Sequence, residues 1–255
     1  MNRKNHVMNN IMFILSRAGE KMKDLEERIG VPAGYLTEKC EQNSSEFDLD
    51  VIVRLAKELH ISADTLLSTN ISSLSSNSKK VVMFLDRLYR DTKNGDLYWE
   101  RESGISLRDS MARYNHPLFE ERDFYKKGEN DGSCMDRDVI FPSFEFDVHT
   151  VIWDDCYHLL LCNGATLYIM NICGQDPLKR ETRRYAKEIW FSTQDGQNFF
   201  YCSNQDDVSA IANLVDTLYS EVRNYVMHAN LRWDMQATLD EYIREGNVPD
   251  EEIAI

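Results

Sequence analysis

Three side chains that could bind a soft metal ion share one face of a predicted strand. Cys156, His158 and Cys162 lie at alternating positions of the segment 156–162, and alternate residues of a strand point to the same side. Thiolate and imidazole groups bind zinc, and His149 would lie near them across a turn. The spacing matches no zinc finger, however, and cysteines in strands of a cytoplasmic protein usually belong to the core. We therefore assign these cysteines to the core and predict no metal and no cofactor.

The other residues that could do chemistry form no catalytic motif. HExxH, P-loop, GxGxxG and GxSxG patterns are absent, which excludes the enzymes that these motifs define. Asp154-Asp155 and Asp206-Asp207 could bind a cation, but the second pair fits a helix cap better. Arg180, Arg183 and Arg184 could bind an anion, although a solvated face is the simpler interpretation. We expect no enzymatic activity.

The first 67 residues carry the pattern of five short helices. Gly30 fits the end of the second helix, Pro32 fits the start of the third, and Asp48 and Ser62 fit the caps of the last two. Apolar residues recur at helical spacing in each. In order, these are Ile11, Ile14, Leu15 and Ala18, then Met22, Leu25 and Ile29, then Tyr35 and Leu36, then Leu49, Ile52, Val53, Ala56 and Leu59, and finally Leu66 and Leu67.

The order and spacing of these helices resemble the helix-turn-helix of the Cro and phage-repressor proteins, the XRE family. The resemblance covers about residues 8–68. It rests on Leu25, the turn Ile29-Gly30-Val31, the pair Tyr35-Leu36, and Val53 with the run Leu-Ala-Lys-Glu-Leu-His-Ile-Ser-Ala-Asp-Thr-Leu-Leu at 55–67. It implies a five-helix domain that binds double-stranded DNA, and we predict such a domain over residues 1–67.

The resemblance also implies which residues would contact DNA. In the family, the third helix enters the major groove and its N-terminal side chains reach the base edges. Lysines at the start of the second helix would lie near phosphates, because a helix N-terminus favours an anion. By position, the candidate DNA-binding residues are Lys21, Lys23, Ala33, Gly34, Thr37, Glu38, Lys39 and Asn43.

Several residues depart from the family pattern. Glu26 replaces a customary small alanine, and Pro32 stands where a serine or threonine usually caps the third helix. Glu38 places a negative charge on the reading surface, where it would repel phosphate or accept from a cytosine N4 group. Residues 1–76 contain nine basic and eleven acidic residues, so the basic footprint of a strong DNA binder is missing. The alternative is a protein-interaction module, immunity or antitoxin-like, whose helix-turn-helix no longer binds DNA.

Residues 68–78 contain six serines and no charge, which predicts a flexible linker. Beyond it, residues 79–255 combine helix and strand patterns. We expect a helix at 79–92, short helices near 106–114 and 117–127, and two helices near the C-terminus, one carrying Ile211, Leu214, Val215, Leu218 and Val222 and one carrying Leu231 and Leu239. We expect strands at 97–99, 139–147, 150–154, 157–162, 165–172, 184–192 and 198–202, with hairpin turns at Asn163-Gly164 and Asp195-Gly196. This pattern predicts an α+β domain with an antiparallel sheet.

Composition limits the class of protein further. The chain of 255 residues has a net charge of −14 and 28% charged residues, which is typical of a globular protein and disfavours non-specific binding to nucleic acid. No segment has the apolar length of a membrane span, so we predict a cytoplasmic protein without membrane contact. The combined prediction is a homodimeric transcriptional regulator, whose acidic C-terminal domain dimerises, senses a small ligand or recruits a protein partner.

Overall fold

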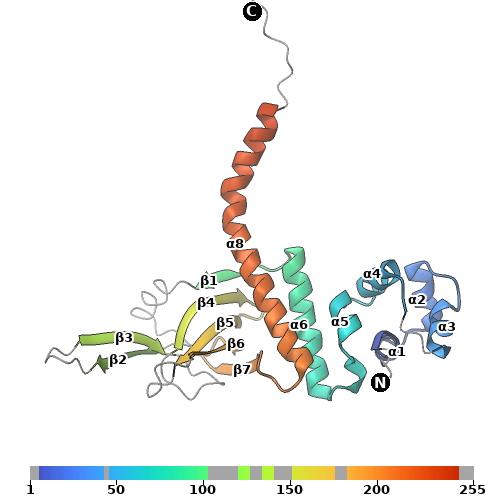
Figure 1. Cartoon of the computed structure of the whole chain (residues 1–255), viewed down its shortest axis with the longest axis horizontal. Coiled ribbons are helices and arrows are strands. Elements are labelled where there is room, and N and C mark those ends of the chain that lie inside the picture. The colour runs from blue at the N-terminus through green and yellow to red at the C-terminus, as the bar shows by residue number, and fades with distance from the viewer. Residues whose placement is uncertain are drawn as a thin grey trace, which may run out of the picture.

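The computed structural model describes residues 6–42, 46–102, 120–126, 134–140, 151–175 and 183–246 (Figure 1). A helical N-terminal region is followed by an antiparallel five-stranded sheet and a C-terminal helix. This order agrees with the predicted helical region and α+β region. His149, Asn43 and the predicted helix at 106–114 lie outside the described residues.

Five helices occupy the N-terminal region. They are α1 (His6–Ala18), α2 (Met22–Ile29), α3 (Tyr35–Glu41), α4 (Leu49–Glu58) and α5 (Ala63–Ser68). Each contributes buried aliphatic side chains to one core, among them Ile11, Leu25, Leu36, Leu55 and Leu66. The predicted start of the third helix is wrong. α3 begins at Tyr35, because Gly34 has a φ of +89° and leaves Pro32 and Ala33 in the preceding turn.

The segment 68–78 is not the flexible linker that its serines predicted. It contains the end of α5, the 3-10 turn η1 (Ile71–Ser73) and the start of α6 (Ser76–Asn94). Ile71 is 0% exposed and its N–H donates to Asn10 Oδ1 at 2.9 Å. Asn10 Nδ2 in turn donates to Leu66 O at 3.1 Å and Thr69 O at 2.6 Å. The prediction failed because the serine content of the segment does not reveal that Ile71 is buried. Nor does it reveal that Asn10, far away in the sequence, holds the backbone of Ile71 in place.

The main sheet has the strand order β1-β4-β5-β6-β7, and all neighbours are antiparallel. Its strands are β1 (Glu100–Glu102), β4 (Val151–Leu160), β5 (Thr166–Gln175), β6 (Arg183–Ser192) and β7 (Asn198–Ser203). The predicted turns at Asn163-Gly164 and Asp195-Gly196 are confirmed. Gly164 and Gly196 have φ values of +77° and +79°, and each turn is closed by a backbone hydrogen bond, from Leu161 N to Ala165 O and from Thr193 N to Gln197 O.

Three strand and helix predictions are corrected. In place of two strands at 150–154 and 157–162, the described residues of both segments up to Leu160 belong to the single strand β4, whose register shifts between Trp153 and Asp155 instead of breaking. The segment predicted as a helix at 117–127 contains the strand β2 (Glu120–Lys126), paired with β3 (Cys134–Ile140) in a separate two-stranded sheet. Of the predicted strand 139–147, residues 139–140 belong to β3 and the rest lies outside the described residues, whereas β1 begins after the predicted strand 97–99.

α6 and the long helix α8 (Ser209–Gly246) pack together and cover one face of the main sheet (Figure 1). Phe84 of α6 contacts the rings of Phe191 and Tyr201, and Tyr219 of α8 contacts that of Tyr157. Two C-terminal helices were predicted, but α8 is continuous, since no glycine or proline interrupts residues 209–245. The apolar stripe that predicted the first of these two helices is buried within the single chain. It comprises Ile211, Leu214, Val215, Leu218 and Val222.

Within the described ranges, no helix combines the length and the apolar character needed to cross a membrane.

Candidate nucleic-acid interface

The start of α3 is capped by a buried carboxylate from α2. Glu26 is 2% exposed, and its side chain accepts hydrogen bonds from Gly34 N at 2.8 Å, Leu36 N at 2.7 Å and Thr37 N at 3.4 Å. The first amides of a helix have no partner within the helix, and a carboxylate there also interacts favourably with the helix dipole. Glu26 therefore supplies the cap that Pro32 does not, and it fixes α3 against α2.

The end of α2 is fixed by a cation from α4. Gly30 adopts a left-handed conformation (φ +68°) and its N–H bonds to carbonyls of the last turn. Arg54 Nη1 donates to Ile29 O at 2.6 Å, while its Nη2 lies 2.8 Å from Asp50 Oδ2. Because both ends of the turn 30–34 are held, the geometry of α2 and α3 is defined by contacts within the N-terminal region.

The structure places most of the predicted DNA-binding residues on the surface. Ala33 and Gly34 are exposed in the turn, and Thr37 and Glu38 are exposed on the first turn of α3, whereas Leu36 is buried beneath them. Lys21 and Lys23 are also exposed, at the start of α2. They precede the turn residues in the sequence, and α2 packs against α3. The predicted residues Ala33, Gly34, Thr37 and Glu38 are thus exposed around the start of α3.

Two of the predicted residues already have partners in the chain. Lys39 is half-buried, with its ammonium 5.8 Å from the centroid of Tyr35 and 5.9 Å from that of Phe47, so it makes cation–π contacts. Glu38 accepts from Gln42 Nε2 at 2.8 Å, one helical turn away. A DNA contact by either residue would compete with these local interactions.

The electrostatic balance of α2 and α3 is acidic. Residues 21–42 contain four basic and five acidic side chains. Arg28 is committed to ion pairs with Glu20 and Glu58, both at 2.5 Å, and its hydrogen bond to Glu20 is the main cause that raises its pKa. Among the described contacts, Lys21, Lys23 and Lys39 have no acidic partner, but the ammonium of Lys39 lies over the rings of Tyr35 and Phe47, which leaves Lys21 and Lys23 as the exposed cations of this segment without a described partner.

Sequence reasoning missed the roles of Glu26 and Arg54. Glu26 was interpreted as a departure from the family pattern, since a large acidic residue stands where a small one is usual. The signal that could have identified its role was the combination of an acidic residue in α2 with the absence of a serine or threonine cap before α3. The spacing of Arg54 and Asp50 predicts their i,i+4 ion pair, but no sequence signal predicts the bonds of Arg54 to backbone carbonyls 24 and 25 residues away.

The cysteines considered for zinc do not gather at a site. Cys156 is buried, which raises the pKa of its thiol, while Cys162 is exposed in the turn after β4. His158 lies instead between two carboxylates of β1, with its Nε2 3.2 Å from Glu100 Oε2 and its Nδ1 2.9 Å from Glu102 Oε1. No cluster of three or more potential metal ligands occurs among the residues that the structure describes.

No protein-family model, curated protein or solved structure matches the chain.

Proposed function

We propose that the chain is a DNA-binding transcriptional regulator, in which α3 enters the major groove. One observation carries this proposal. The first turn of α3 exposes Thr37 and Glu38, while Glu26 and Leu36 hold its inner side. A reading helix needs this combination, because its side chains must reach base edges from a backbone whose position is fixed.

The roles of the residues follow from their chemistry. Thr37 and Glu38 are the side chains suited to base edges, a threonine as donor or acceptor and a glutamate as acceptor from cytosine N4. Lys21 and Lys23, exposed at the start of α2, are suited to backbone phosphates. Lys39 contributes less than these two, because its ammonium already rests on two rings.

The test is a binding assay of the whole chain against random genomic fragments, at low and at moderate salt. Selected fragments should share a sequence, and Lys21→Ala with Lys23→Ala should weaken binding to all fragments and reduce its salt dependence. Glu38→Gln should relax specificity at one position and cost on the order of 1–3 kcal/mol there. The control is Lys57→Ala, which removes a lysine from the exposed side of α4 and should leave binding close to that of wild type.

A second candidate function is favoured by the acidic surface. Since Arg28 and Arg54 are paired within the chain, the exposed charge around α3 is dominated by carboxylates such as Glu38 and Glu41. Such a surface suits a basic protein partner better than a phosphate backbone. If neither wild type nor Glu38→Gln binds any DNA fragment at low salt, the protein-interaction function replaces the regulator.

The proposed regulator acts as a homodimer, since one helix reads too few base pairs for useful specificity. The stripe from Ile211 to Val222 is buried in the chain and is not the contact. Val226 is buried and Met227 is exposed, and the C-terminal part of α8 continues away from the sheet and from α6 (Figure 1). We therefore place the dimer contact on residues 227–246. Light scattering should give a dimer for the whole chain and a monomer after truncation at residue 226.

A further inference from the structure

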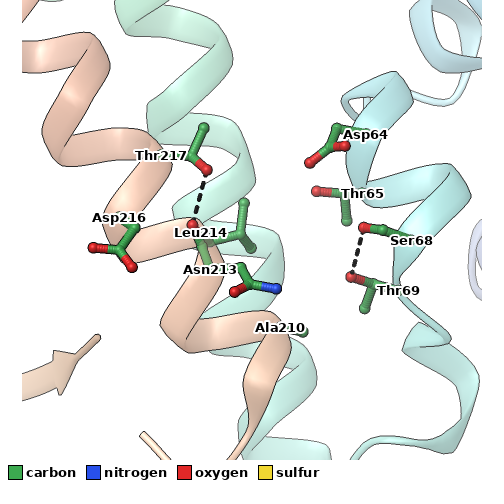
Figure 2. Close-up of a pocket in the computed structure, with 9 residues that line it drawn as sticks. All are labelled: Asp64, Thr65, Ser68, Thr69, Ala210, Asn213, Leu214, Asp216 and Thr217. Carbon is green, nitrogen blue, oxygen red and sulfur yellow. Dashed lines mark hydrogen bonds between the residues drawn. The ribbon is translucent and has the colours of Figure 1, made fainter. Parts of the chain in front are cut away.

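A cavity lies between α5 and the first turns of α8 (Figure 2). Its volume is about 360 Å³, which falls in the range of small-molecule sites, roughly 300–1,000 Å³. Because α5 belongs to the N-terminal helices and α8 to the part that carries the sheet, an occupant would contact both. The lining residues are Asp64, Thr65, Ser68, Thr69, Ala210, Asn213, Leu214, Asp216 and Thr217.

The lining is rich in oxygen and contains no basic residue. The lining consists of four hydroxyl groups, one amide, two carboxylates and two apolar side chains, those of Ala210 and Leu214. A carboxylate accepts hydrogen bonds and cannot donate them. An anion would therefore be repelled, whereas a ligand with positive charge and several N–H or O–H groups would be matched.

One hydroxyl group of the lining is oriented as an acceptor. Thr217 Oγ1 donates to Asn213 O at 2.8 Å, within α8. Since the single hydroxyl proton of Thr217 is used within the protein, its oxygen is left with lone pairs only. This arrangement again favours a ligand that donates.

The two carboxylates differ in how far they are already neutralised. Asp216 accepts from Lys187 Nζ at 2.5 Å and from Asn204 Nδ2 at 3.1 Å. Asp64 is exposed on α5, and its side chain takes part in none of the hydrogen bonds and ion pairs among the described residues. In Figure 2 it lies on the α5 side of the cavity, across from Thr217. Asp64 is therefore the group best placed to hold a positive charge.

We infer that this cavity binds a small organic cation, whose ammonium group pairs with Asp64 and whose other polar hydrogens donate to Thr217 and Asn213. The cation could come from a polyamine or from an amino sugar, which share a primary ammonium group. The site does not depend on whether α3 binds DNA, and its test contains no DNA.

Isothermal titration of the whole chain with spermidine and with glucosamine tests this site, with glucose as a neutral control. One of the two amines should bind saturably at a single site, and the one that binds identifies the source. Asp64→Asn should weaken that binding about tenfold, as expected for loss of a hydrogen bond to a charged group. Asp96→Asn is the matched control, because it removes the same charge from an exposed position just after α6 and should leave the affinity unchanged.

A second variant tests the cavity itself. Ala210→Leu adds volume to the lining from the α8 side without changing any charge, and it should abolish binding while the thermal unfolding temperature stays within a few degrees of wild type. Absence of saturable binding by both amines overturns the inference. An equal loss of amine affinity in Asp64→Asn and Asp96→Asn also overturns it, because this would indicate general attraction to an acidic protein. Equal affinities for glucose and glucosamine overturn it as well.

Discussion

Ser62 and Asp86 join the N-terminal helices to α6 through a buried hydrogen-bond group. Ser62 Oγ donates to Asp86 Oδ1 at 2.5 Å, and Ser62 N lies 3.1 Å from both carboxylate oxygens. Asp86 is 1% exposed, and Arg90 Nε, 3.0 Å from its Oδ2, balances its charge. The N-cap of α5 is thus completed by a side chain of α6, so these two helices are coupled although the sequence between them suggested a flexible linker.

Asp86→Ala should lower the free energy of unfolding by roughly 2–4 kcal/mol, because it leaves Ser62 N and the partly buried Arg90 without their partner. Urea unfolding followed by circular dichroism measures the change. Asp91→Ala is the control, since Asp91 forms an i,i+4 pair with the exposed Arg87, and such pairs contribute less than about 1 kcal/mol. Equal effects of the two substitutions would contradict the structural role of Asp86.

Glu26→Ala should lower the free energy of unfolding by on the order of 2–4 kcal/mol, because three amides at the start of α3 lose a charged acceptor. Amide hydrogen exchange should accelerate at Leu36 and Thr37 more than in α4. Glu27→Ala, at an exposed position of the same helix, should change stability by less than about 0.5 kcal/mol. Unchanged exchange at Leu36 in Glu26→Ala would show that the cap is dispensable.

His158 should make the stability of the chain depend on pH. The pKa of His158 is raised, chiefly by its hydrogen bond with Glu102, with Glu100 adding to the effect and burial opposing it. A raised pKa in the folded state means that the stabilisation is fully present below the unfolded pKa of about 6.5 and is lost as the pH rises through the folded value.

The matched measurement compares wild type with His158→Gln by urea unfolding from about pH 6 to about pH 9, a range that spans the ordinary histidine pKa. The stability advantage of wild type should be largest at the acidic end and should decline towards the alkaline end. A difference that stays constant over this range, or that grows with pH, would contradict the assigned direction of the shift.

The elements that the sequence predicted well are those with strong local signals. Asn163-Gly164 closes a turn because glycine tolerates the left-handed conformation that the turn requires, and α1 to α5 follow their apolar periodicity. The failures are non-local. The burial of Ile71 depends on Asn10, 61 residues away, and the cap of α3 depends on a glutamate in the preceding helix. For the candidate site, the DNA-binding role of the exposed residues stays a prediction, and the sequence did not predict the partners of Glu38 and Lys39 within the chain.

The core of the N-terminal helices includes Ile71, which lies beyond the boundary predicted at residue 67. If the first domain ended at residue 67, a fragment 1–67 would be as stable as a fragment 1–74. We expect otherwise, because Ile71 is fully buried against the N-terminal core and its N–H closes a hydrogen bond to Asn10. Burial of one isoleucine contributes about 1.5–3 kcal/mol, so fragment 1–74 should unfold at a clearly higher urea concentration.

Ile71→Ala within fragment 1–74 separates the side-chain contact from an effect of length alone, since it should remove the part of the gain that comes from burial while the backbone hydrogen bond to Asn10 remains. Both fragments lack Asp86 and lose its cap on Ser62 equally, so the comparison between them is unaffected. Equal unfolding curves for the two fragments would restore the boundary at residue 67. If fragment 1–74 does not fold at all, α6 is required and the N-terminal helices are not an independent domain.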